Sequence, residues 1–376
     1  MRPIQMVDTK TQYLKIKTQV DAGIHQVLDS TAYINGKPVK DFAANLSSYL
    51  NVKHTITCAN GTDALQIALM ALGLKPGDEV ITPSFTYVAT TEVVALLKLK
   101  PVFVEVDKET FNIDPKAIEA AITPKTKVIV PVHLYGQAAN MEEIMGVAAR
   151  HNLFVIEDNA QAIGCNYTLA DGSVKKTGTI GTIGTTSFYP SKNLGAYGDG
   201  GAIFTNEDVL AEKLQMIANH GQKVRYYHEM VGCNSRLDSI QAAVLDVKLR
   251  YLDEYIIARQ KAAAFYDKAF AGNDKITLPK TAPFTNHVYH QYTLLMHHIN
   301  RDELHKYLGT QQIPSMIYYP VPAHRQKMFA AFGGGDYNLP VTDWLTERVI
   351  SLPIHTELDE EQLQYITEHV LRFINR

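Results

Sequence analysis

The stretch of sequence that decides the fold is Phe154-Val155-Ile156-Glu157-Asp158-Asn159-Ala160-Gln161, an apolar run that ends in acidic and amide side chains. β-branched residues in a short apolar run predict a buried strand, and the polar residues after it predict a turn. Similar runs occur upstream at residues 80–82, 102–104 and 128–132, with helix-like stretches between most of them. We therefore expect an α/β fold with a mostly parallel central sheet and helices on both faces.

A second, smaller unit is expected after this sheet. A long helical pattern around residues 238–259 is interpreted as a bridge to this second unit, and the sequence pattern changes after Gly272. Residues 290–296 predict a strand of an antiparallel sheet, and the chain ends in an amphipathic helix capped by Asp359 and Gln362. We predict a large domain over residues 1–250, with an N-terminal arm, and a small C-terminal α+β domain over residues 251–376.

Composition limits the classes of function. The 376 residues are 46% hydrophobic and 20% charged, with a formal net charge of −3, which is typical of a globular protein. No basic run predicts a nucleic-acid surface, and no apolar run is long enough for a signal peptide or a membrane span. The widely spaced Cys58, Cys165 and Cys233 favour reduced thiols in a cytoplasmic protein over disulfides or zinc. We expect no metal site.

The most informative loop is Ser187-Phe188-Tyr189-Pro190-Ser191-Lys192-Asn193-Leu194-Gly195, which follows another strand-like run. Asp158 is predicted at the carboxyl end of a parallel strand, where ligands bind in such sheets. A lysine paired with an acid indicates pyridoxal phosphate (PLP), because the amine can hold the aldehyde as a Schiff base while the acid keeps the ring nitrogen protonated. Taken singly, Asp158 could be a surface carboxylate and Lys192 a solvated cation.

A phosphate partner is predicted where Asn60-Gly61-Thr62-Asp63-Ala64-Leu65 opens a helix. Free backbone N–H groups at a helix N-terminus bind anions, and Ser187 offers a second donor. Asn60 or Thr62 could instead simply cap the helix. The joint occurrence of partners for the phosphate, the ring nitrogen and the aldehyde favours a PLP site over each separate explanation.

These stretches, together with four more, resemble the DegT/DnrJ/EryC1/StrS sugar aminotransferase family from about Val7 to about Leu371. The further motifs are Pro83-Ser84-Phe85-Thr86-Tyr87-Val88-Ala89-Thr90, His133-Leu134-Tyr135-Gly136-Gln137, Gly198-Asp199-Gly200-Gly201 and Asn234-Ser235-Arg236-Leu237-Asp238. The resemblance implies a fold-type-I PLP-dependent transferase that aminates nucleotide-linked keto-sugars.

The resemblance also implies residue roles. Lys192 is the catalytic residue, which forms the Schiff base and then moves a proton between the amino donor and the cofactor, and Asp158 pairs with the ring nitrogen. The other implied cofactor contacts are Gly61, Thr62 and Ser187 at the phosphate, Gln161 at the 3-oxygen side, Tyr87 on a ring face, and Asn234 reaching the phosphate from the other subunit. The last contact implies a homodimer with shared active sites.

Residues 58–66 and 198–206 are most similar to the branch that aminates UDP-2-acetamido-2-deoxy-3-oxo-glucuronate with L-glutamate for surface polysaccharides such as lipopolysaccharide. Arg236 is predicted to bind a carboxylate, although a structural ion pair with Asp238 is an alternative. Tyr318 stands where that branch is expected to carry histidine, and His324 resembles the dTDP-3-oxo-6-deoxyhexose branches. We predict Arg236, Tyr318 and His324 as substrate-binding residues; His290 and His324 could also be packing residues.

Other functions of this fold need separate consideration. Sugar dehydratases that resemble the family replace the Schiff-base lysine with histidine, so Lys192 argues against dehydration. A non-enzymatic regulator should lose part of the cofactor set, and the whole set is present. An amino-acid aminotransferase stays possible, because a fold does not determine its substrate.

Overall fold

A seven-stranded sheet lies at the centre of the computed structural model, which describes residues 1–376. Its strand order is β1-β9-β8-β5-β4-β2-β3. The strands are β1 His54–Cys58, β2 Glu79–Pro83, β3 Lys100–Val104, β4 Thr126–Ile129, β5 Phe154–Asp158, β8 Ile183–Ser187 and β9 Gly201–Thr205. All neighbouring pairs from β8 to β3 are parallel, and β9 is antiparallel to both β8 and β1. The predicted mostly parallel sheet is confirmed.

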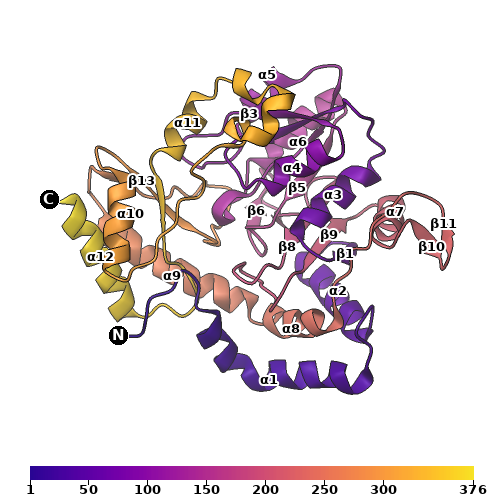
Figure 1. Cartoon of the computed structure of the whole chain (residues 1–376), viewed down its shortest axis with the longest axis horizontal. Coiled ribbons are helices and arrows are strands. Elements are labelled where there is room, and N and C mark those ends of the chain that lie inside the picture. Colours follow the sequence, from indigo (N-terminus) through magenta and orange to yellow (C-terminus); the bar gives the residue numbers. More distant parts are fainter.

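Helices cover both faces of this sheet (Figure 1). Val155 and Ile156 are consecutive in β5, yet they belong to different hydrophobic clusters because strand side chains alternate between faces. The cluster with Val155 includes α2 Lys37–Leu50, α5 Pro115–Ala121, α6 Met141–His151 and α8 Ser239–Leu249. The cluster with Ile156 includes α3 Gly61–Ala71, α4 Ala89–Leu96 and α7 Asp208–Ala218. Burial on both faces explains why the central strands are apolar throughout.

The C-terminal part of the chain forms a second hydrophobic core around a three-stranded antiparallel sheet. It consists of β12 Ile276–Thr277, β13 Tyr292–Met296, β14 Val349–Leu352, α9 Leu252–Phe270, α10 Arg301–Thr310, α11 Pro340–Thr346 and α12 Glu360–Ile374. The predicted capping box of Asp359 and Gln362 is confirmed. The long helix predicted around residues 238–259 is instead two helices, because α8 ends at Leu249 and α9 begins at Leu252.

Smaller elements connect these parts. They are the hairpins β6 Asn166–Thr168 with β7 Val174–Lys176 and β10 Gln222–Val224 with β11 Tyr227–His228, and the 3-10 helices η1 Leu134–Gly136, η2 Ala323–Arg325, η3 Lys327–Phe332 and η4 Gly334–Asp336. In Figure 1 the β10–β11 hairpin lies at the outer edge of the molecule, beyond α7. None of the helices combines the length and the apolar character that crossing a membrane requires.

We propose that the two domains meet at the break between α8 and α9, at residues 250 and 251. Leu252 and Ile256 at the start of α9 still pack in the core of the large domain, and the C-terminal core includes α9 from Ala262 onward. The N-terminal arm contacts both. Helix α1 Thr9–Ser30 packs Ile16 and Val20 against α8, whereas Ile4 belongs to the C-terminal core. Arg2 donates to the carbonyl of Glu357 at 2.7 Å, which places the N-terminus beside α12 (Figure 1). The arm therefore connects the two predicted domains.

Candidate active site

A cavity of about 480 Å³ lies at the carboxyl ends of β2, β5 and β8, where the strand order brings loops from distant parts of the sequence together. The C-terminal part of the chain contributes a second wall with His290, Gln291, Tyr318 and Tyr319. All of the predicted cofactor contacts except Asn234 line it: Gly61, Thr62, Tyr87, Asp158, Gln161, Ser187 and Lys192. The substrate candidate Tyr318 also lines it.

One end of the cavity presents unpaired donors. The Oδ1 atom of Asn60 accepts the N–H of Asp63 at 2.8 Å, so Asn60 is the cap of α3. The N–H groups of Gly61 and Thr62 stay free, as expected for the first residues of a helix. A Cβ atom on Gly61 would lie 2.6 Å from Cβ of Ser187, so glycine is required for this close approach. The resulting cradle suits an anion such as phosphate.

Glu157 and Asp158 are consecutive, and their carboxylates have different environments. Glu157 is fully buried and accepts hydrogen bonds from the N–H groups of Gly178, Ile180 and Gly181 at 2.6–2.7 Å and from Nε2 of His133 at 2.8 Å. Burial alone would raise the pKa of Glu157, but these hydrogen bonds hold the pKa below its ordinary value of 4.5. Glu157 is therefore an ionised structural carboxylate whose acceptor sites are filled by the protein.

Asp158 keeps unused acceptor capacity. Its Oδ2 atom accepts the hydroxyl of Thr90 at 2.8 Å, and its Oδ1 atom accepts the N–H of Ala160 at 3.1 Å. A carboxylate has about four acceptor sites, so two donors leave room for another. Because Asp158 is only 5% exposed and lines the cavity, the group that can use this capacity is a ligand N–H.

Lys192 lies in the loop between β8 and β9, and its ammonium group has no ion pair or hydrogen bond within the protein. Burial lowers its pKa to about 8, and the nearby Asp158 opposes part of this effect. The loop is fastened on two sides. Asn193 donates to the carbonyl of Val288 at 2.9 Å, and the buried Lys248 donates to the carbonyl of Gly195 at 2.5 Å. Lys192 is thus a positioned amine that loses its proton at a lower pH than an ordinary lysine.

Another part of the cavity wall is built from Gln161 and aromatic rings. The amide of Gln161 accepts the N–H of Tyr135 at 2.7 Å and donates to the hydroxyl of Tyr319 at 3.0 Å. The rings of Tyr87 and Tyr319 have centroids 6.0 Å apart. Tyr135 also donates its hydroxyl to the carbonyl of Tyr318. These contacts fix the Tyr318–Tyr319 loop against the predicted cofactor contacts.

Three predicted residues do not line this cavity. His324 is 1% exposed; its Nδ1 atom lies 2.7 Å from Oγ of Ser84, and its Nε2 atom lies 3.4 Å from Asp343. It therefore supports the loop behind Tyr319 instead of facing the cavity. Asn234 is exposed at the base of the β10–β11 hairpin, and Arg236 is half-buried. Arg236 forms no ion pair, so the alternative pairing with Asp238 is not found.

Sequence reasoning left His290 open and did not single out Thr90 or Tyr319. The structure places His290 in the cavity wall, where burial and the nearby Lys192 hold the pKa of the imidazole well below its ordinary value. Its Nδ1 atom and the hydroxyl of Thr86 are buried without a partner, which is unusual unless a ligand supplies one. The motif Pro83-Ser84-Phe85-Thr86-Tyr87-Val88-Ala89-Thr90 ends at Thr90, and this position is the sequence signal for that residue.

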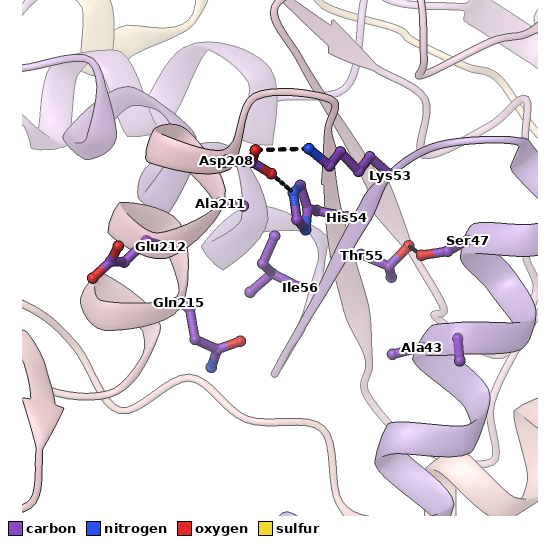
Figure 2. A pocket seen from close by; sticks show the side chains of 11 residues that line it. Ala43, Ser47, Lys53, His54, Thr55, Ile56, Asp208, Ala211, Glu212 and Gln215 are labelled. Atoms are coloured by element: carbon purple, nitrogen blue, oxygen red, sulfur yellow. Dashed lines mark hydrogen bonds and ion pairs between the residues drawn. The ribbon is translucent and has the colours of Figure 1, made fainter.

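A second hollow, of about 470 Å³, lies between α2, β1 and α7 and shares no residue with the cavity around Lys192. Figure 2 shows Lys53 and His54 pointing to the same carboxylate, that of Asp208, at 2.7 and 2.6 Å. Ala43 and Ile56 supply apolar surface beside them. Lys53 and His54 pair with Asp208, and the remaining carboxylate, Glu212, pairs with Lys223 outside the groove, so every charged group of this groove already has a protein partner.

A lysine, an unfilled carboxylate and a helix N-terminus at the carboxyl ends of a parallel sheet fit the aldehyde, ring nitrogen and phosphate of PLP. They define an enzyme of the fold-type-I PLP class. The particular family is shown by comparison. Residues 15–371 match the DegT/DnrJ/EryC1/StrS aminotransferase family, and the chain belongs to it. The chain is therefore a PLP-dependent sugar aminotransferase.

Individual relatives are similar over nearly their whole length. The chain is 47% identical over 372 residues to the pleiotropic regulatory protein of Geobacillus stearothermophilus, covering 98% of each chain. It is also 47% identical over 363 residues to the UDP-2-acetamido-2-deoxy-3-oxo-D-glucuronate aminotransferase of Pseudomonas aeruginosa, covering 96% of this chain and 98% of that one. The crystal structure of S. venezuelae DesV has a TM-score of 0.95 and 39% identity, with both chains fully covered.

Proposed function

We propose that this enzyme transfers the amino group of L-glutamate to UDP-2-acetamido-2-deoxy-3-oxo-glucuronate in the synthesis of a surface polysaccharide. The observation that carries the chemistry is the cavity that joins Lys192 and Asp158 to the free N-terminus of α3. The 47% identity to the Pseudomonas aeruginosa enzyme supports this substrate. The 39% identity to the dTDP-3-amino-3,4,6-trideoxy-alpha-D-glucose transaminase of Streptomyces venezuelae keeps a dTDP-3-oxo-6-deoxyhexose as the alternative. The free cysteines favour the reducing cytoplasm.

Each residue of the cavity has a separate role in this reaction. The cradle of Gly61, Thr62 and Ser187 holds the cofactor phosphate, and Tyr87 and Gln161 contact the ring. Bound PLP supplies an electron sink for the α-carbon of the amino donor. Asp158 stabilises the protonated ring nitrogen with its unfilled acceptor capacity. The amine of Lys192, with its pKa lowered to about 8, accepts a proton from the donor α-carbon and returns it at the cofactor.

Adding the two substrates to the enzyme one after the other provides the direct test of this function. Holoenzyme mixed with L-glutamate should release 2-oxoglutarate in an amount equal to the enzyme, and the UDP-keto-sugar should then gain an amine, as detected by mass spectrometry. Turnover restricted to a dTDP-keto-sugar would establish the alternative substrate. Amination of a free α-keto acid only, or a product that has lost a hydroxyl group, would contradict the proposal. The UDP-sugar without its keto group is the matched control.

We also propose a homodimer in which each copy completes the active site of the other. The cavity contains Lys192 as its only cation, beside Asp158 and Asp199, although glutamate and nucleotide sugars are strongly anionic. Asn234 lies at the base of the hairpin that projects at the edge of Figure 1. This hairpin region exposes apolar side chains that a second copy would cover, namely Val224, Tyr226, Tyr227 and Val231. Arg236, half-buried and unpaired in a single copy, is available for a substrate carboxylate.

Hybrid dimers should reveal the shared sites. The variants Lys192→Ala and Asn234→Ala should each be inactive or strongly impaired, since each lacks one group in every site. In an equal mixture half of the dimers are hybrids with one intact site, so activity should recover to about a quarter of the wild-type value. Recovery after denaturation and joint refolding, followed by kinetics, is the measurement. No recovery, with dimers confirmed by light scattering, would contradict the contribution of Asn234 across the dimer.

A further inference from the structure

Thr90 contacts the carboxylate of Asp158 from a different part of the fold. It lies in the first turn of α4, whereas Asp158 ends β5, and both side chains are buried. The Oγ1 atom of Thr90 and Oδ2 of Asp158 are 2.8 Å apart. Because an ionised carboxylate only accepts hydrogen bonds, the hydroxyl of Thr90 is the donor. The contact therefore fixes one oxygen of the carboxylate from outside its own strand.

The neighbouring threonine, Thr91, shows the hydrogen bond that a threonine hydroxyl ordinarily makes in this helix. Thr91 is also buried, and its hydroxyl donates to the carbonyl of Val88 at 2.9 Å, within its own helix. That is the usual hydrogen bond of a threonine in a helix. Thr90 does not make it, and its hydroxyl instead reaches across to β5. The two residues thus offer the same chemical group in the same helix with different partners.

The two donors of Asp158 together determine the plane of its carboxylate. Ala160 holds Oδ1 through its N–H at 3.1 Å, and Thr90 holds Oδ2. Helix α4 is itself held by Val93 and Val94 in the core beneath the sheet, so the position of Thr90 is set by packing. The remaining acceptor sites of Asp158 then have one direction, toward the cavity.

We propose that Thr90 is a positioning residue that orients the Asp158 carboxylate toward the ring nitrogen of the cofactor. This inference rests on the proposed role of Asp158. Without the hydroxyl, the carboxylate keeps a single donor and rotates more freely, so its hydrogen bond to the ring N–H weakens. The ring nitrogen then loses its proton at a lower pH, and the cofactor binds less tightly.

The test compares holoenzymes of Thr90→Val, Thr90→Ser and Thr91→Val. Valine keeps the shape of threonine and removes the hydroxyl, and serine restores the hydroxyl. With ¹⁵N-labelled PLP, the ¹⁵N chemical shift of the ring nitrogen reports its protonation as the pH is raised. In T90V we expect deprotonation at a pH lower by about one unit and a dissociation constant for PLP about tenfold higher, the scale of one hydrogen bond to an ionised group. T90S and T91V should match the wild type.

The variant Asp158→Asn separates this inference from the proposed function. It should move deprotonation of the ring nitrogen to a much lower pH than in the wild type, and adding T90V to it should change neither the chemical shift nor the affinity further. If D158N alters the profile and T90V does not, the role of Thr90 is overturned while that of Asp158 stands. The same holds if T90V raises the pH of ring deprotonation, or if T91V reproduces its effect. If D158N leaves the profile unchanged, Asp158 does not face the ring nitrogen, and the proposed role of Asp158 fails together with that of Thr90; the substrate is tested separately by the turnover experiment.

Discussion

Replacement of Lys192 by alanine is expected to abolish transamination and to prevent covalent attachment of PLP to the protein. The amine is both the nucleophile for the aldehyde and the base for the donor α-carbon, so the loss of turnover should be at least roughly 10³-fold. Borohydride reduction of the wild-type holoenzyme, followed by peptide mass spectrometry, should find the cofactor on Lys192. The variant should bind PLP without this covalent mark, because the phosphate cradle and Asp158 are intact.

Lys248 provides the sharpest control for this experiment, since it is the other lysine with a strongly lowered pKa. Burial lowers the pKa of Lys248 to about 7, yet its Nζ atom donates to the carbonyl of Gly195 at 2.5 Å and does not line the cavity. Reactivity judged from pKa alone would favour Lys248, whereas access to the cavity favours Lys192. Cofactor on Lys248 in the wild type, or undiminished turnover in Lys192→Ala, would contradict the assignment.

Local sequence was sufficient to predict the groups that lie at strand ends. Asp158 follows directly on an apolar run, and Lys192 follows the next strand in the sheet, so short motifs specified both positions. The order of strands then brings them to one edge, as the rule for parallel sheets predicts. The positions of Asn60 and Gly61 at the start of a helix were predictable for the same reason, because a few consecutive residues determine where a helix begins.

The parts that sequence reasoning did not supply depend on contacts between distant residues. Ser84 and His324 are separated by 240 positions, and their hydrogen bond buries an imidazole that was predicted to meet the substrate. Thr90 and Asp158 are 68 positions apart, and no periodic pattern relates them. A residue type and its place in a motif state which chemistry is available, but burial decides whether the side chain meets solvent, substrate or another part of the protein.

The second large effect is expected from Glu157→Gln, a change outside the cavity. In the wild type, one carboxylate oxygen of Glu157 accepts from the N–H groups of Ile180 and Gly181, and the other accepts from Gly178 and His133. The single amide oxygen of glutamine can keep only one of these pairs of hydrogen bonds. The NH₂ group, which is itself a donor, then faces the other pair of donors. Buried donors without acceptors should lower the free energy of unfolding by about 3–5 kcal/mol. Denaturant titration of the apoprotein measures it. Glu119→Gln, which alters an exposed ion pair with Arg150, is the matched control and should cause no measurable change.

The pH dependence distinguishes an ionised Glu157 from a buried neutral acid. Because the pKa of Glu157 is lower in the folded protein than its ordinary value of 4.5, the unfolded state takes up its proton first as the pH falls. The stabilisation is therefore complete above the unfolded pKa and disappears as the pH falls through the folded pKa. Glu157→Gln lacks this titration, so the difference in stability between wild type and variant should shrink below about pH 4.5. A difference that stays constant or grows in acid would mean that Glu157 is protonated in the native protein, and that its hydrogen bonds to Gly178 and Gly181 do not depend on charge.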